Sequence, residues 1–266
     1  MRRAVPYTDV PERRKGTPDK RDFVLPTTRE GKNHWEPLPG LLRLQSCLPS
    51  PFRPHALSTM APPSETDLVQ LDPEQPFWER FYMVAPLVII GTRNDDEDTY
   101  NLAPKHMAAP MGWDNYFGFV CTPKHKTYRN AVRHGTYTVS YPKPSQVVLA
   151  SLAAAPRVGP PDGPRRKPSL DQLPTFPATE VDGVFLNDGY LFLECELDRR
   201  VDDLGENSLL IGKVKAVHVD KTALRVSEKE EDAVLRDNPL LAYLPPDRYA
   251  TIKDSNIFPF PAGFEK

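Results

Sequence analysis

The chain has 266 residues and a formal net charge of −2, so it can hold one large domain or one domain with an appendage. Its first 60 residues contribute +5 of that charge, which leaves −7 for the rest and argues against a nucleic-acid platform there. No apolar run reaches membrane length, and three scattered cysteines argue against a disulfide framework or a metal site. We expect no membrane partner, a reducing compartment and a cytoplasmic location, with the mitochondrion as the alternative.

The N-terminal part is rich in prolines and charged residues. Residues 1–60 contain nine prolines and seventeen charged residues, without a periodic apolar segment. Such a composition predicts a disordered extension, because it cannot bury enough apolar surface to offset its ordering entropy. Residues 61–75 are then a linker, and Met60 is a possible functional start.

Strand patterns dominate the part that follows, with few helical patterns between them. In residues 136–142, for example, Tyr137, Val139 and Tyr141 alternate with small polar residues. The other expected strands are 86–91, 116–122, 191–197 and 209–219, the last two joined by a hairpin around 204–207. The sequence therefore predicts a mainly β protein with a few short helices, and an antiparallel barrel rather than a doubly wound parallel sheet.

A short helix is expected after the 116–122 strand. Thr127 is a candidate N-cap and Gly135 a candidate C-cap. Basic residues crowd its first turns, and an anion gains hydrogen bonds and a favourable field at a helix start. The possible phosphate contacts are Lys124, Lys126, Thr127, Arg129, Asn130 and Arg133. The alternative is a capped helix with a solvated basic surface.

Two further segments are not strands. Residues 155–169 (A-P-R-V-G-P-P-D-G-P-R-R-K-P-S) contain too many prolines for a core element, and are either a lid or an exposed connector. Residues 228–244 begin as an acidic helix that breaks near Pro239, and residues 256–266 form a C-terminal tail.

Several of these segments, in this order and spacing, resemble the flavin reductase-like family, whose domain is an FMN-binding split β-barrel. The matching segments are V-A-P-L-V-I-I-G-T-R-N (84–94), N-L-A-P (101–104), Y-F-G-F-V-C-T-P (116–123), H-K-T-Y-R-N (125–130), H-G-T-Y-T-V-S-Y (134–141), L-F-L-E-C-E-L (191–197), L-L-I-G-K-V-K-A-V-H-V (209–219) and R-Y-A-T-I (248–252). The resemblance implies an antiparallel Greek-key split barrel of the FMN-binding type over residues 76–255.

The resemblance also implies a cofactor site. Asn101, Leu102, Ala103 and Pro104 would follow the isoalloxazine or the ribityl chain. The phosphate would lie against Lys124, His125, Lys126, Thr127 and Asn130. The implied cofactor is FMN, with FAD as the alternative, and the implied assembly is a homodimer with the flavin near the interface.

Other side chains leave alternatives open. His106 is either a proton donor to flavin or substrate or a surface histidine, whereas His218 is expected to be structural. Trp113, Tyr116 and Phe117 either cover a ring or fill the barrel. Cys121 and Cys195 are expected in the core, and no metal site is expected.

The function implied is an NAD(P)H-dependent flavin reductase or related oxidoreductase, in which a nicotinamide passes hydride to the flavin. The partners are then flavin and nicotinamide small molecules. The alternative is a non-catalytic flavin-binding module for storage, sensing or partner interaction.

Overall fold

A computed structural model describes residues 68–95, 99–160, 166–225 and 231–263. Apart from Leu68, these residues belong to one compact unit that runs from Val69 to Lys266. The predictions for the 1–60 extension and for residues 61–67 of the linker lie outside the described residues. Within the described ranges, no helix combines the length and the apolar composition that crossing a bilayer requires.

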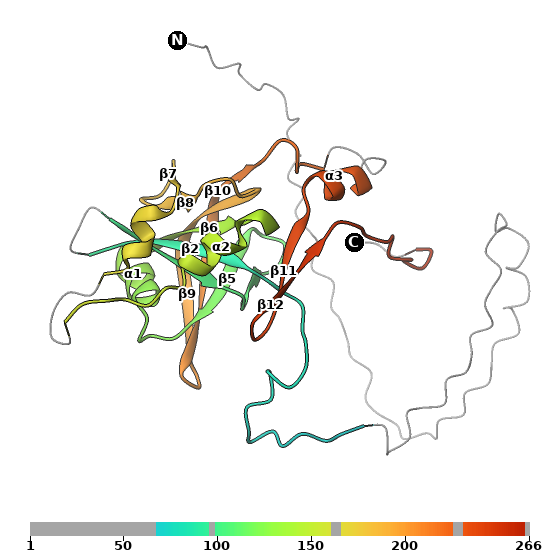
Figure 1. Cartoon of the computed structure of the whole chain (residues 1–266), viewed down its shortest axis with the longest axis horizontal. Helices are drawn as coiled ribbons and strands as arrows, with labels where there is room; N and C mark the ends of the chain where they lie inside the picture. Colours follow the sequence, from blue (N-terminus) through green and yellow to red (C-terminus); the bar gives the residue numbers. More distant parts are fainter. Residues whose placement is uncertain (1–67, 96–98, 161–165, 226–230, 264–266) are drawn as a thin grey trace, which may run out of the picture. The chain divides into compact units, whose positions relative to one another are not determined.

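The main sheet has seven strands, and every neighbouring pair is antiparallel (Figure 1). Its order is β3-β2-β6-β9-β10-β5-β4. The strands are β2 (Val88–Arg93), β3 (Tyr100–Lys105), β4 (Ala108–Pro110), β5 (Tyr116–Cys121), β6 (Thr136–Tyr141), β9 (Leu191–Leu204) and β10 (Asn207–Val219). β9 and β10 separate β5 from β6, although these two follow each other in the chain, so their connection makes a Greek-key crossover. The predicted antiparallel split barrel is confirmed.

Smaller elements surround this sheet. A second sheet pairs β1 (Ala85–Pro86), β11 (Leu240–Leu244) and β12 (Arg248–Ile252), and a third pairs β7 (Thr175–Pro177) with β8 (Val184–Leu186). The helices are α1 (Lys126–His134), α2 (Val147–Leu152) and α3 (Glu231–Asp237), with short 3₁₀ turns at Pro144–Gln146 and Pro168–Gln172. The expected acidic helix is therefore α3, and it ends before Pro239.

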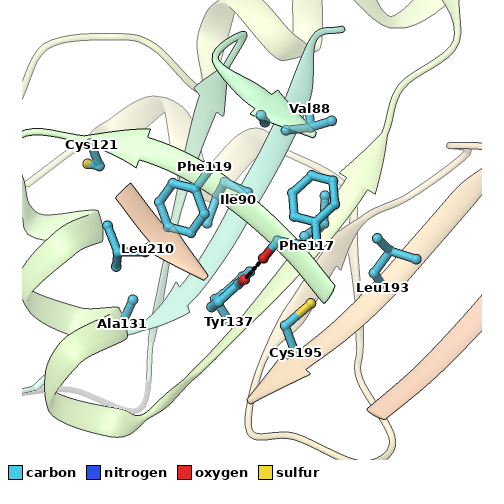
Figure 2. Packing of buried hydrophobic residues seen from close by; sticks show 12 residues of the cluster. Val88, Ile90, Phe117, Phe119, Cys121, Ala131, Tyr137, Leu193, Cys195 and Leu210 are labelled. Atoms are coloured by element: carbon cyan, nitrogen blue, oxygen red, sulfur yellow. Dashed lines mark hydrogen bonds between the residues drawn. The ribbon is translucent and has the colours of Figure 1, made fainter. Parts of the chain in front are cut away.

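Both faces of β2 are buried, which explains its unbroken apolar run. Val88 and Ile90 pack into the barrel core with Phe117, Phe119, Tyr137 and their neighbours (Figure 2). Ile89 points the other way and packs with Leu102, Leu186 and residues of α2. Next on β2, Gly91 is required because a Cβ there would lie 2.3 Å from Thr138 Oγ1 and 2.5 Å from the Val184 carbonyl oxygen.

The three aromatic residues for which the sequence left alternatives open differ in their burial. Phe117 is buried, and its carbonyl oxygen accepts a hydrogen bond of 2.7 Å from the Tyr137 hydroxyl (Figure 2). Tyr116 is half-buried, with Lys213 Nζ 4.6 Å from its ring centroid. Trp113 does not fill the barrel, because its side chain is 99% exposed in the turn between β4 and β5.

The two described cysteines follow the prediction. Cys121 on β5 and Cys195 on β9 are both buried and free. Burial raises the pKa of the Cys195 thiol to about 12, so that it remains protonated at neutral pH. Both side chains belong to the buried cluster of the barrel core.

Candidate functional site

A cavity of about 340 Å³ lies where β3, the first turn of α1 and the segment after α2 meet. Six of the nine residues predicted to hold a cofactor line it: Asn101, Ala103, Pro104, His125, Lys126 and Thr127. The other lining residues are Lys105, Ala154, Ala155, Pro156, Arg157 and Lys167. The structure thus brings the N-L-A-P strand and the helix start together, although some 20 residues separate them in the chain.

A buried hydrogen bond fixes β3 against α1. Asn101 Nδ2 donates to Thr127 Oγ1 at 3.0 Å. The predicted role of Thr127 as N-cap was wrong, because the helix begins at Lys126 and His125 is the residue in extended conformation before it. A turn in which the His125 amide donates to the Thr122 carbonyl oxygen starts the helix early enough to place Thr127 inside its first turn. Among the described residues, no side-chain hydrogen bond caps the start of this helix.

Three predicted residues do not line the cavity. Leu102 points to the opposite face of β3 and packs beneath α2, as strand alternation requires. Lys124 is exposed, with its Nζ 3.3 Å from Glu206 Oε1. Asn130 is buried on the inner side of α1, where its Nδ2 lies 3.2 Å from both Thr92 Oγ1 and Asn94 Oδ1. It therefore joins α1 to β2 rather than facing the cavity.

Two cations of the proline-rich segment line the cavity and were missed as site residues. Arg157 Nη2 donates to Asn101 Oδ1 at 2.5 Å. Lys167 Nζ donates to the carbonyl oxygens of Ala153, at 2.9 Å, and Leu102, at 3.5 Å. Residues at the two described ends of the 155–169 segment thus line the cavity. The sequence signal that could have identified these two residues is the presence of basic residues among the prolines of this segment.

The cavity is strongly electropositive. Lys105, Lys126, Arg157 and Lys167 line it, and no carboxylate is among the lining residues within the described ranges. Burial, and then the charges of Arg157 and Lys105, lower the pKa of Lys167 to about 8. Burial and the neighbouring lysines also lower the pKa of His125, which favours its neutral form. An anion bound here would relieve the repulsion among these cations.

A second cavity of about 330 Å³ adjoins the first and shares Pro104 and Ala154 with it. His106 lines this second cavity rather than the first, with its ring centroid 5.2 Å from that of Tyr243. Burial and the charge of Lys105 lower the pKa of His106. His106, the weak candidate for a catalytic residue, therefore lies in a different cavity from the predicted phosphate contacts.

His218 has a different environment from the other two histidines. Its Nε2 lies 2.8 Å from Oε1 of the buried Glu194, and its ring makes an edge contact with Phe185. These contacts agree with a structural residue. Among the described residues, no group of three or more histidine, cysteine or acidic side chains lies close enough to hold a metal ion.

A comparison with known protein families identifies the family of this chain. Residues 80–244 match the model described as the flavin reductase like domain. The chain belongs to this family. No curated protein matches the chain.

Solved structures agree with the family assignment at the level of the fold. Nitrilotriacetate monooxygenase component B from Bacillus cereus has a TM-score of 0.60 and 17% identity, covering 72% of this chain and 98% of that one. An FMN-binding protein from Thermus thermophilus has a TM-score of 0.56 and 20% identity, covering 72% and 98%. The 2-nitrobenzoate 2-nitroreductase of Pseudomonas fluorescens has a TM-score of 0.55 and 16% identity, covering 68% and 87%.

Proposed function

We propose that this flavin reductase-like protein binds FMN in the cavity between β3 and α1 and works as an NAD(P)H-dependent flavin oxidoreductase. The observation that carries the proposal is the electropositive cavity at an uncapped helix start. Backbone amides of a helix start and basic side chains together suit a phosphate. The names of the structural neighbours, which include an FMN-binding protein and a nitroreductase, support the same chemistry.

The residues present fit the phosphate end of the flavin. Lys126 and Thr127 would hold the phosphate at the start of α1, with Arg157 positioned by Asn101 beside them. The β3 residues Ala103 and Pro104 would lie along the ring system. A bound flavin supplies the hydride chemistry, for which the protein needs to provide orientation and exclusion of water. FAD is the alternative cofactor.

We also propose a homodimer. The described chain exposes several large apolar side chains that a second copy would cover: Trp78, Phe81, Tyr82, Ile257 and Phe258. Analytical ultracentrifugation of the purified chain should give twice the monomer mass. A monomer at micromolar concentration would contradict this part of the proposal.

The test of the function is a purification followed by an anaerobic reduction. We expect the full-length chain to be yellow, with flavin absorbance that bleaches when NADH or NADPH is added without oxygen. Bound flavin that neither nucleotide bleaches would favour the non-catalytic flavin-binding module. A chain that does not bind added FMN would contradict the proposal as a whole.

A further inference from the structure

A thiol and an imidazole are in contact between the barrel core and the electropositive cavity. Cys121 ends β5 and is only 2% exposed within the core (Figure 2). Its Sγ lies 3.9 Å from Nδ1 of His125, which is within reach of a sulfur hydrogen bond. His125 is the residue before α1, and it also lines the cavity. The imidazole therefore connects a buried thiol to the site proposed for the cofactor.

The turn between β5 and α1 sets this contact. The His125 amide donates to the Thr122 carbonyl oxygen at 3.0 Å, which folds the chain back and leaves the imidazole beside the end of β5. The same carbonyl oxygen lies 3.7 Å from Cys121 Sγ. The thiol thus has two acceptors within reach, the Thr122 carbonyl oxygen, which already accepts the His125 amide, and His125 Nδ1.

The choice between these acceptors decides which nitrogen of His125 carries a proton. Burial, and then the charges of Lys105 and Lys167, lower the pKa of His125, so its imidazole is neutral at pH 7.5 and has one N–H donor and one acceptor. An imidazole nitrogen accepts a hydrogen bond better than a thiol sulfur does, so the S–H group donates to Nδ1. The proton of the ring is then on Nε2, on the side of the ring away from the thiol.

We propose that Cys121 is a positioning residue of the cofactor site, whose thiol holds His125 as the Nε2–H tautomer and so provides an N–H donor for the phosphate of bound FMN. This inference rests on the proposed function, in which the phosphate lies at the start of α1, directly after His125. The oxygens of an ionised phosphate accept hydrogen bonds. A neutral histidine that turned a lone pair toward them would repel the ligand, whereas one that turns an N–H toward them attracts it.

The two buried cysteines offer a matched pair of variants. Cys121→Ala removes the donor to His125. Cys195→Ala is the control, because Cys195 belongs to the same core cluster but its thiol contacts Tyr137 instead. Cys121→Ser retains a hydrogen-bond donor at the end of β5. His125→Leu removes the imidazole, and His125→Gln replaces it by a carboxamide, whose N–H does not depend on the thiol.

The first measurement is made on the ligand-free full-length chain with nitrogen-15 in its histidines, at pH 7.5. Long-range proton–nitrogen NMR spectra distinguish the two neutral tautomers, and the spectrum of His125→Leu identifies the signals of His125. We expect the Nε2–H tautomer in the wild type, in Cys121→Ser and in Cys195→Ala, and an increased share of the Nδ1–H tautomer in Cys121→Ala. An Nδ1–H tautomer in the wild type, or a tautomer that Cys121→Ala leaves unchanged, would overturn the inference.

The second measurement is a fluorescence titration of each variant with FMN and with riboflavin, which lacks the phosphate. His125→Leu should raise the dissociation constant of FMN by about tenfold, because a hydrogen bond to a charged group is lost. Cys121→Ala should raise it by about threefold, and Cys121→Ser and Cys195→Ala by less than about twofold. Riboflavin binding should change by less than about twofold in all of them. In a His125→Gln chain, Cys121→Ala should have no further effect on FMN.

Three other results would contradict the inference. Equal losses of FMN affinity in Cys121→Ala and Cys195→Ala would show that the thiol acts through core packing. The same conclusion follows if Cys121→Ala weakens FMN as much in the His125→Gln chain as in the wild type. Equal losses in Cys121→Ser and Cys121→Ala would show that the donor has no part. A wild type that binds no FMN contradicts the proposed function instead, and this failure is distinguishable because the tautomer is measured without ligand.

Discussion

Asn101 on β3 donates a buried hydrogen bond of 3.0 Å to Thr127 in the first turn of α1, across 26 positions of the chain. Arg157, which comes from the segment after α2, in turn donates to the side-chain oxygen of Asn101. Three separate elements are thus tied together by one asparagine at the wall of the electropositive cavity. The geometry of the proposed phosphate site depends on this chain of contacts.

Replacing Thr127 by valine tests the contribution of its hydroxyl group while the volume of the side chain is kept. Thr127→Val keeps the volume but leaves the buried Asn101 Nδ2 without its acceptor, which costs ~1–3 kcal/mol of unfolding free energy. FMN affinity should fall as well, because the hydroxyl and the position of Asn101 are both lost. Chemical denaturation and fluorescence titration measure the two effects.

The matched control is Thr127→Ser, which retains the hydroxyl. It should keep most of the affinity for FMN and lose less stability than the valine variant. If serine and valine variants bind FMN equally well, the hydroxyl of Thr127 has no part in the site.

The sequence predicted the strands well because their apolar alternation is a local property. The 136–142 and 116–122 strands are found within one residue of the expected ends. It could not show which side chains of the N-L-A-P strand face the cavity, because both faces of β3 are covered and Leu102 turns to the second core. Arg157 and Lys167 were missed because the contacts of a proline-rich segment depend on the tertiary fold. Trp113 does not fill the barrel, although a large aromatic residue usually packs, because it lies in an exposed turn.

Lys167 should make FMN binding depend on pH. Its pKa is about 8 in the folded chain against 10.5 normally, because of burial and of neighbouring Arg157 and Lys105. At pH 9 much of it is therefore neutral, and a bound phosphate would favour its charged form again. We expect FMN binding at pH 9 to take up protons, measured by calorimetry in two buffers of different ionisation enthalpy.

Lys167→Arg tests whether this residue is the one that titrates, because arginine stays charged at pH 9. The variant should lose most of the proton uptake and bind FMN with less dependence on pH between 7 and 9. The exposed Lys221→Arg is the control and should behave as the wild type. Unchanged proton uptake in Lys167→Arg would contradict the assignment.

In the absence of ligand, the lowered pKa of Lys167 should make the folded chain more stable as pH rises. The unfolded chain binds the Lys167 proton more tightly than the folded chain, so the free energy of unfolding should rise as pH increases from about 8 to 10.5. Lys167→Met should reduce this rise. Denaturant titrations at pH 8 and pH 10 measure it, and an equal rise in the variant would show that other groups cause it.

Glu194 should be a major source of acid sensitivity. Burial by itself raises the pKa of this carboxyl, but hydrogen bonds from the Thr179 and Glu180 amides, His218 and the Thr179 hydroxyl lower it to about 2. A carboxylate with a lowered pKa stabilises the fold above its unfolded value of 4.5, and this stabilisation is lost as pH falls towards 2. Glu194→Gln should therefore cost ~1–3 kcal/mol at pH 7 and much less at pH 3.

The neighbouring Glu196→Gln provides the control for that variant. Glu196 is on the same strand, but its carboxylate is exposed and pairs with Lys215 at 3.1 Å. Its replacement should change the unfolding free energy by less than ~1 kcal/mol. A Glu194→Gln variant as stable as Glu196→Gln at pH 7 would show that the buried hydrogen bonds contribute little.

The most direct test of the proposed phosphate site is a comparison of FMN with riboflavin, which has the same ring and chain but no phosphate. One charge-assisted contact contributes ~1.5–3 kcal/mol, and several converge here, so FMN should bind at least about tenfold to a hundredfold more tightly than riboflavin. In Lys126→Ala with Thr127→Ala most of that difference should disappear, while riboflavin binding changes little. Equal dissociation constants for the two ligands in the wild-type chain would contradict the assignment of this cavity to the flavin phosphate.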